Sequence, residues 1–120
     1  MRASQFFSRQ KHEEGIQVPL PLPDGSESGE FVVLMGRDSR TFRKAQSDYR
    51  NRMMIAKVDQ KEFDEYTEGI KLTASAIKSW TLEDELTQEA AVEMLTNAPY
   101  ILDALDSALY DNKRFFVGKE

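Results

Sequence analysis

Residues 16–35 have the sequence IQVPLPLPDGSESGEFVVLM, and this stretch decides the fold class. Its first half alternates apolar residues with others at the period of two that is typical of a β-strand. Because Pro19 and Pro21 cannot donate ladder hydrogen bonds, this segment is expected to be either a strand at the edge of a sheet or simply an extended segment. A turn sequence, Pro23-Asp24-Gly25-Ser26, separates it from a second apolar run in residues 30–35. The stretch therefore predicts a β-hairpin, which needs helices or a second subunit to pack against.

Two helices are expected directly after the hairpin. The first follows an N-cap at Asp38 or Ser39, and its apolar residues recur at three- and four-residue spacing: Phe42, Ala45, Tyr49, Met53 and Ala56. Asp59 with Glu62 resembles a capping box and predicts the start of a second helix. The apolar face of that helix is expected to consist of Phe63, Tyr66, Ile70, Ala74 and Ile77.

Two further helices are expected in the last third of the chain. Thr87 is a suitable cap for a short helix that ends near Asn97. Pro99 fits the first turn of the last helix, because the N–H that proline lacks is not needed there. The sequence thus predicts an α+β fold that is mainly α, with an N-terminal β-hairpin followed by about four helices.

The 120 residues are expected to form one domain with a tail at each end. Residues 1–15 show no apolar period and predict a flexible N-terminal tail, while residues 16–116 hold the hairpin and the helices. Residues 117–120 are expected to form a C-terminal tail. His12, the only histidine, falls in the N-terminal tail and is expected to be solvated.

The net charge of −5 conceals a basic half and an acidic half. Residues 1–57 carry ten Lys/Arg and seven Asp/Glu, a net +3, whereas residues 58–120 carry six and fourteen, a net −8. This asymmetry indicates two elements that pair with each other, or an acidic face offered to a partner. No apolar run approaches the roughly 20 residues that span a membrane, and the polar N-terminus does not resemble a signal peptide.

No group of residues has the pattern of an active site. His12 lacks a rigid frame for general base catalysis and companions for a metal site, and the chain has no cysteine. The carboxylates at 64–68 and 83–85 lie on polar faces, whereas acid–base catalysis needs two carboxyl groups in contrasting environments. We therefore expect no catalytic residue, no cofactor and no metal, and a protein that is not an enzyme.

The first expected helix is unusually basic. Residues 37–52 contain six basic side chains, at Arg37, Arg40, Arg43, Lys44, Arg50 and Arg52. Such a cluster is compatible with a small nucleic-acid-binding regulator, because binding to nucleic acid requires neutralised phosphates. The acidic chain as a whole, and the absence of a nucleic-acid motif, favour pairing of this helix with the acidic second helix instead, within or between subunits.

Short motifs follow one another in a particular order along residues 18–116. Early in the chain these are LPDGS at 22–26, GEFV at 29–32 and GRDS at 36–39, followed by Phe42. Later ones are IKSW at 77–80, Leu86-Thr87 with Glu89 and Leu95, and PYIL at 99–102. In this order and spacing they resemble the tail assembly chaperones of long-tailed, siphophage-type bacteriophages.

The resemblance implies a virion-assembly factor of the host cytoplasm that is absent from the finished virion. Members of this family bind the phage tape measure protein and keep it soluble while tail tube subunits polymerise around it, and they tend to self-associate. Many are also made in a longer form by a ribosomal frameshift, which implies contact with the tail tube protein. Gly118-Lys119 is compatible with a slippery codon pair for such a frameshift.

The residues we expect at a partner-binding surface are Phe31, Val33, Arg40, Arg43, Lys44, Met53 and Trp80. Methionines such as Met53 offer adaptable apolar surface, although ordinary core filling explains them equally well. Trp80 is either a core residue that anchors the acidic connector after it or a hot spot for a partner. The exposed edge of the hairpin is the expected place for self-association. A nucleic-acid-binding regulator and a structural tail completion protein remain as alternative functions.

Overall fold

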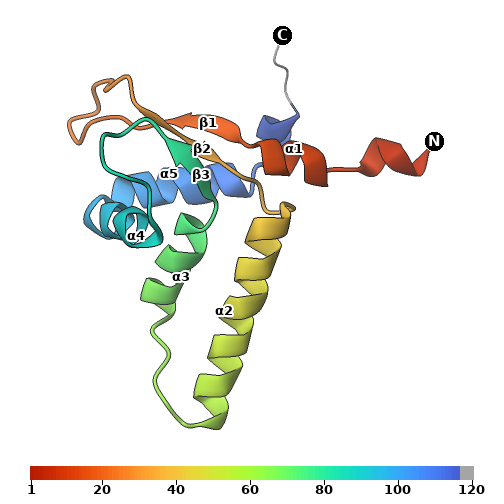
Figure 1. The fold of residues 1–120 in the computed structure, drawn as a ribbon, viewed down its shortest axis with the longest axis vertical. Helices are drawn as coiled ribbons and strands as arrows, with labels where there is room; N and C mark the ends of the chain where they lie inside the picture. The colour runs from red at the N-terminus through yellow and green to blue at the C-terminus, as the bar shows by residue number, and fades with distance from the viewer. Residues whose placement is uncertain (117–120) are drawn as a thin grey trace.

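The computed structural model describes residues 1–116, and it confirms an α+β fold that is mainly helical. The strands are β1 (Ile16–Pro19), β2 (Phe31–Leu34) and β3 (Ile77–Trp80). The helices are α1 (Arg9–Glu14), α2 (Arg40–Val58), α3 (Glu65–Ala74), α4 (Gln88–Asn97) and α5 (Pro99–Leu109), with 3-10 segments η1 (Ala3–Phe6) and η2 (Asn112–Phe115) (Figure 1). The expected C-terminal tail, 117–120, which includes Gly118 and Lys119, lies outside the described residues.

The predicted hairpin is confirmed, and it belongs to a three-stranded antiparallel sheet in the order β1-β2-β3. Val18 lies opposite Val32 in the first pair of strands, and Val32 lies opposite Trp80 in the second. The proline-containing strand β1 is at the edge, as the missing N–H groups require. Strand β2 is therefore the centre of the sheet and not an edge.

The prediction that the second helix continues to Ile77 is wrong. Helix α3 ends at Ala74, and residues 77–80 form β3. The reason is tertiary: β2 has an open edge that pairs with Ile77 and Trp80, residue types that suit a pleated, half-buried surface. The start of this helix also differs from the prediction, since Asp64 and not Asp59 caps it, by accepting the Thr67 N–H.

The core lies between one face of the sheet and the helices α3, α4 and α5. Val18, Val32 and Leu34 enter it from the sheet, and all three are at most 3% exposed. The helices contribute apolar side chains at the positions that their periodicity predicts, among them Ile70, Ala91, Leu95, Leu102, Leu105 and Leu109. Thr73 of α3 donates a 2.6 Å hydrogen bond to Asp106 of α5, which joins these two helices.

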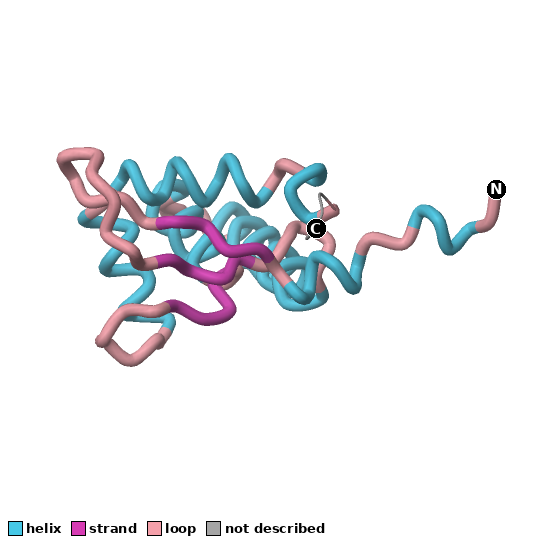
Figure 2. Tube along the Cα trace, turned by 90° about the horizontal axis from the view of Figure 1, so that it is seen from above, coloured by secondary structure: helices cyan, strands magenta, loops and turns pink. Residues whose placement is uncertain are grey.

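Residues 8–15, which were predicted to be part of a flexible tail, contain α1 and connect directly to β1. The expectation of a solvated His12 is wrong, because its side chain is 0% exposed. Its ring stacks on Phe115 of η2 at a centroid distance of 4.5 Å, so α1 and η2 are packed together. Residues 1–7, by contrast, extend away from the rest of the molecule (Figure 2), and Phe6 and Phe7 are each 71% exposed.

Helix α2 projects from the molecule together with α3, and a loop joins them at the far end (Figure 1). Ser39 caps α2 as predicted, with its Oγ accepting the Phe42 N–H at 3.1 Å. Phe42 is the only buried residue among the 19 of this helix. We call residues 49–69, which include the distal half of α2 and the start of α3, the arm.

Candidate protein-binding surfaces

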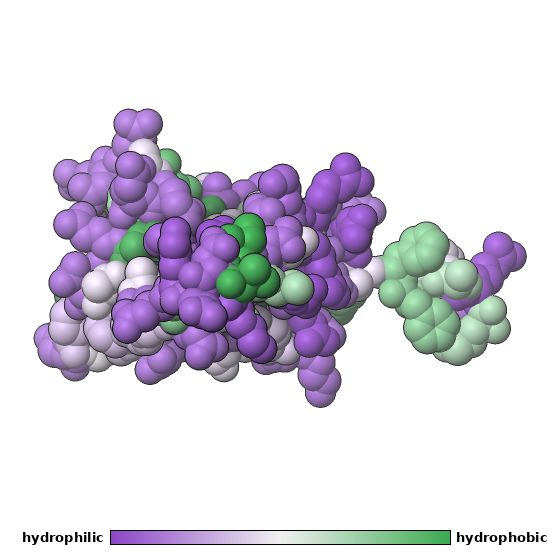
Figure 3. All heavy atoms as spheres, turned by 90° about the horizontal axis from the view of Figure 1, so that it is seen from below, coloured by the Kyte–Doolittle hydropathy of each residue, from purple (hydrophilic) through white to green (hydrophobic). Residues whose placement is uncertain are grey.

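The arm exposes a group of apolar side chains near the end of α2. Met54, Ile55 and Val58 are 65%, 60% and 79% exposed. Three- and four-residue spacing places them on the same side of the helix. Figure 3, viewed from below, shows apolar side chains gathered near the middle of this end of the molecule, surrounded by hydrophilic ones. Single exposed apolar residues are ordinary, but a contiguous group of this kind is typical of an interaction surface.

Within the arm, α2 is joined to α3 and to the loop before it by few side-chain contacts. The rings of Tyr49 and Phe63 meet edge to face at a centroid distance of 5.4 Å. Arg52 Nε contacts Glu68 Oε1 at 2.9 Å, and Lys71 Nζ contacts the other oxygen of the same carboxylate at 3.3 Å. The predicted pairing of the basic helix with the acidic one is thus confirmed at Arg52–Glu68 alone within residues 1–116. Exposed ion pairs contribute about 0–1 kcal/mol each to stability, so these pairs stabilise the position of the arm only weakly.

The basic residues predicted for partner binding lie at the base of the arm, near the start of α2. Arg40, Arg43 and Lys44 are all exposed there. Arg43 forms a 2.7 Å ion pair with Asp38, and Lys44 forms a 3.2 Å ion pair with Asp48. Hydrogen bonds from the Ser8 hydroxyl and from Arg43 lower the pKa of Asp38, so this carboxylate stays ionised at neutral pH. The basic cluster is therefore partly neutralised at Arg43 and Lys44, while Arg40 forms no ion pair in the part of the chain described.

His12 closes the junction between α1, the start of α2 and η2. Its Nδ1 accepts a 2.8 Å hydrogen bond from the backbone N–H of Asp38, so the proton of the neutral ring is on Nε2. Nε2 has no hydrogen-bond partner within residues 1–116. Burial lowers the pKa of His12, and nearby Arg37 and Arg43 lower it further, whereas Asp38 opposes the shift. This histidine is consequently a neutral structural residue that no substrate can reach.

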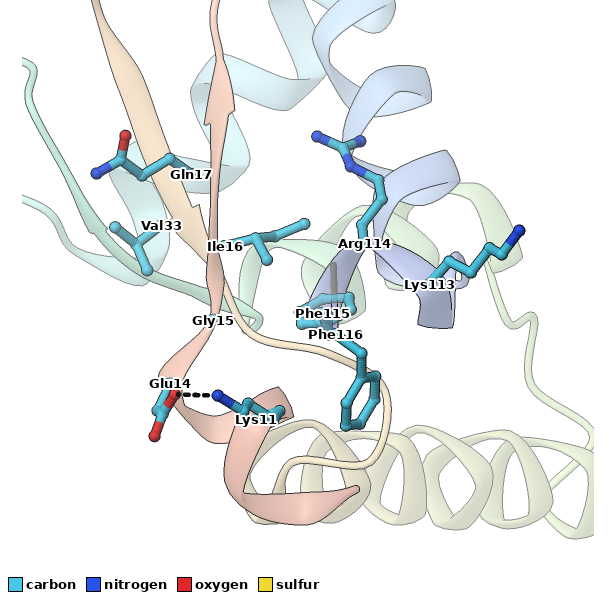
Figure 4. A pocket seen from close by; sticks show the side chains of 10 residues that line it. All are labelled: Lys11, Glu14, Gly15, Ile16, Gln17, Val33, Lys113, Arg114, Phe115 and Phe116. Atoms are coloured by element: carbon cyan, nitrogen blue, oxygen red, sulfur yellow. Dashed lines mark ion pairs between the residues drawn. The ribbon is translucent and has the colours of Figure 1, made fainter. Parts of the chain in front are cut away.

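A hollow of about 790 Å³ lies between α1, β1 and η2. Its charged side chains are Lys11, Glu14, Lys113 and Arg114 (Figure 4). Lys11 is turned toward Glu14 at 3.9 Å, while Lys113 and Arg114 extend in different directions (Figure 4). Small-molecule sites have a few polar groups that converge on the ligand, and here the polar groups diverge. The charged side chains that line the hollow therefore do not converge on one point.

Comparison with models of protein families, with curated proteins and with solved structures gives no match. Within residues 1–116, no group of three or more His, Cys, Asp or Glu side chains is placed to hold a metal ion. The described helices also include none with both the length and the apolar character needed to cross a bilayer. The function is therefore inferred from the exposed side chains described above.

The predicted residues Phe31, Val33 and Trp80 lie on the sheet, in the part of the molecule outside the arm, which we call the body. Phe31 and Val33 are half-buried and alternate with the core residues Val32 and Leu34, so they lie on the outer face of the central strand. Trp80 packs against the core, and its Nε1 donates a 2.8 Å hydrogen bond to the backbone oxygen of Asp84. Of the two roles weighed for Trp80, this geometry fits the anchoring of the acidic connector.

The seven predicted residues therefore do not form one site. The structure groups Arg40, Arg43 and Lys44, places Met53 half-buried on the same side of α2 as Phe42, and leaves the others on the sheet. Ile55 and Val58 are not among the seven predicted residues, although they are among the most exposed apolar residues of the arm. The available signal was that Met54, Ile55 and Val58 fall outside the apolar face of α2 yet share a second face with one another.

Proposed function

We propose that this chain is a tail assembly chaperone of long-tailed bacteriophages, which binds the tape measure protein without catalysis and keeps it soluble during tail tube assembly. The observation that carries the proposal is the exposed apolar group Met54, Ile55 and Val58, which lies on the arm and away from the core. Burial of such side chains against a partner is favourable, and residues 1–116 leave them uncovered. The motif order in residues 18–116 supports the choice of partner.

The positions of the polar groups also agree with a role in binding rather than in catalysis. His12 is buried at the junction of α1 and η2, and the charged side chains of the hollow between α1, β1 and η2 diverge. A tape measure protein, as the resemblance describes it, is long and helical, and an amphipathic helix is covered naturally by helix-in-groove contact. The chain would act in the host cytoplasm, self-associate, reach the tail tube protein through a longer frameshifted form, and be absent from the finished virion.

Co-expression with the tape measure protein encoded in the same genome tests the proposal. We expect the soluble fraction of the tape measure protein to rise with this chain and to fall again with the double variant Ile55→Ser/Val58→Ser. Phe6→Ser/Phe7→Ser is the matched control, because it also removes two exposed apolar side chains, each 71% exposed, at a different place. If the tape measure protein is equally insoluble with and without the chain, the proposal fails.

A nucleic-acid-binding regulator is the second candidate, favoured by the exposed side chains of Arg40, Arg43 and Lys44 at the start of α2. It predicts binding to DNA or RNA that weakens steeply with salt and is lost when these three residues become alanine. A structural tail completion protein is the third candidate. Detection of the chain in purified virions by mass spectrometry would favour that candidate over the chaperone.

A further inference from the structure

One line of exposed side chains runs along α2 from its first residue to its last. The line consists of Arg40, Lys44, Ser47, Asn51, Met54, Ile55 and Val58, all of which are exposed. Steps of three and four residues keep these side chains on one side of the helix, opposite the side that carries Phe42. At 1.5 Å per residue the line is about 27 Å long. We call it the outer face of α2.

The outer face departs from ordinary helix chemistry at both ends. Acidic residues stabilise the N-terminal end of a helix dipole, but the first turn of α2 contains none and its first two turns carry Arg40, Arg43 and Lys44. The acidic groups at this end come from outside the helix: Glu13 accepts the backbone N–H of Arg40, and Asp38 pairs with Arg43. At the other end the dipole is matched by Lys57 in the last turn, but on the outer face itself Ile55 and Val58 face solvent. Local choices that do not serve the fold are expected at functional sites. The two departures lie on the same line of side chains, which makes them parts of one surface.

We propose that the outer face of α2 binds a single amphipathic α-helix of another protein. That helix carries acidic side chains at one end and apolar side chains about 14 residues away, a separation of about 21 Å. Its acidic end lies over Arg40 and over Lys44, where it competes with the exposed Lys44–Asp48 ion pair. Its apolar end covers Met54, Ile55 and Val58. The inference rests on the proposed function and specifies the kind of segment in the tape measure protein that this chain recognises.

The charges of α2 argue against a second copy of this chain as the occupant. Two α2 helices packed in parallel would place Arg40 and Lys44 of one copy against the same residues of the other, and like charges repel. Packed antiparallel, they would place these basic groups against Met54, Ile55 and Val58, where a charge loses water without gaining a partner. Residues 40–58 contain six basic residues and one acidic residue, so the complement of this helix is acidic.

A nucleic acid fits the outer face less well than a helix does. Phosphates would suit Arg40 and Lys44, but they give no reason for three adjacent apolar side chains that are 60–79% exposed on the same face. An amphipathic helix satisfies both ends at once, because its apolar stripe and its acidic residues recur at the same three- and four-residue spacing.

The test uses the full chain and a fluorescein-labelled synthetic helix of about 20 residues. This probe has leucines on one face near one end and three glutamates on that face near the other. Titration followed by fluorescence anisotropy is expected to show saturable binding. A second probe with lysine for glutamate is expected to bind about tenfold more weakly or worse, and the difference should shrink with added salt.

Substitutions in the chain test whether the probe contacts the outer face of α2. Ile55→Ser/Val58→Ser is expected to weaken binding of the acidic probe about tenfold, as is Arg40→Glu/Lys44→Glu. Phe6→Ser/Phe7→Ser and Lys113→Glu/Arg114→Glu remove matched apolar and basic groups elsewhere and should leave binding unchanged. Circular dichroism confirms that each variant is folded. Equal binding of both probes, or wild-type binding by both α2 variants, overturns the proposal.

Two further outcomes separate this inference from the proposed function. If the chain solubilises the tape measure protein but does not bind the acidic probe, the inference fails while the chaperone function stands. If the probe binds through α2 but the tape measure protein stays insoluble, the chaperone function fails and the outer face serves a different helical partner. Binding of a labelled DNA duplex that is lost in Arg40→Glu/Lys44→Glu and unaffected in Ile55→Ser/Val58→Ser identifies the face as a nucleic-acid surface, which also overturns the inference.

Discussion

The two ends of α2 use their apolar side chains in opposite ways. Near the start, Phe42 is 0% exposed and meets the ring of Tyr110 edge to face at 6.4 Å. Near the end, Ile55 and Val58 are 60% and 79% exposed. Both ends belong to one continuous helix, so helix propensity does not account for the contrast. The core stabilises one end through burial, while the apolar side chains of the other end remain available to a different molecule.

The largest expected effect comes from removing the buried anchor of α2. Phe42→Ala should lower the free energy of unfolding by about 3–5 kcal/mol, because it removes a buried aromatic ring and leaves a cavity. Ile55→Ala, at the exposed end, should change it by no more than about 0.5 kcal/mol. Urea denaturation followed by circular dichroism measures both. Similar losses for the two variants would mean that the exposed end of α2 also supports the fold.

A second large effect is expected where α1 meets the body. A Cβ at Gly36 would lie 2.2 Å from Nδ1 of His12, whose ring is enclosed and stacked on Phe115. Gly36→Ala should therefore lower the free energy of unfolding by about 1–3 kcal/mol, since the buried ring must shift from its stacked position to admit the methyl group. The double variant with His12→Ala removes the crowding atoms and should recover part of this loss. A Gly36→Ala variant as stable as wild type would show that the ring is not confined.

The stability of the same junction should depend on pH. Burial lowers the pKa of His12 from its ordinary 6.5, so the unfolded chain binds the proton more readily than the folded one. The stabilisation is fully present above about pH 6.5 and is lost as the pH falls toward the lower pKa of the folded state. Protonation of Nδ1 also removes the acceptor for the Asp38 N–H. Denaturation curves across this range, at fixed ionic strength, should show the loss.

His12→Asn isolates that effect. The amide oxygen of asparagine can accept the Asp38 N–H in place of Nδ1, and it does not titrate. The pKa of Asp38 is lowered from its ordinary 3.8, chiefly by the Ser8 hydroxyl, so this carboxylate remains ionised in the same range. A variant that retains the full pH dependence of the wild type would assign it to another group.

Local chemistry accounts for what the sequence predicted correctly. The hairpin follows from alternation and a Pro-Asp-Gly-Ser turn, and the caps at Ser39 and Thr87 follow from hydroxyl groups placed before apolar periods. Pro99 stands in the first turn of α5 for the same kind of local reason. Each of these features depends on residues within a few positions of one another.

The features that were not predicted depend on residues far apart in the chain. Strand β3 forms because Ile77 and Trp80 meet the open edge of β2, about 45 residues earlier. His12 is buried because Gly36 leaves room for its ring and Phe115 covers it, which no local pattern near residue 12 indicates. The candidate surface was found in part: Arg40 and Lys44 came from composition, whereas the importance of Ile55 and Val58 appears only when the buried side of α2 is known.

A smaller, stabilising effect tests whether the arm unfolds separately from the rest of the molecule. Gly69 lies within α3, and a Cβ there would meet nothing within 4 Å. Gly69→Ala should stabilise the arm by about 0.5–1 kcal/mol, because alanine loses less conformational entropy than glycine on entering a helix. If the arm opens without the body, amide hydrogen exchange in α3 should slow while exchange in β2 and α5 does not change.

Gly25→Ala is the matched control for this last substitution. A Cβ at Gly25 would also meet nothing within 4 Å, but its φ of 91° is one that residues with side chains rarely adopt. The control should therefore destabilise the turn even though the space is equally open. If Gly69→Ala slowed exchange equally in the arm and in the core strands, the two regions would unfold as one unit. The exposed apolar end of α2 would then be coupled to the core. Dissociation of a partner from that end would in that case change the stability of the whole molecule.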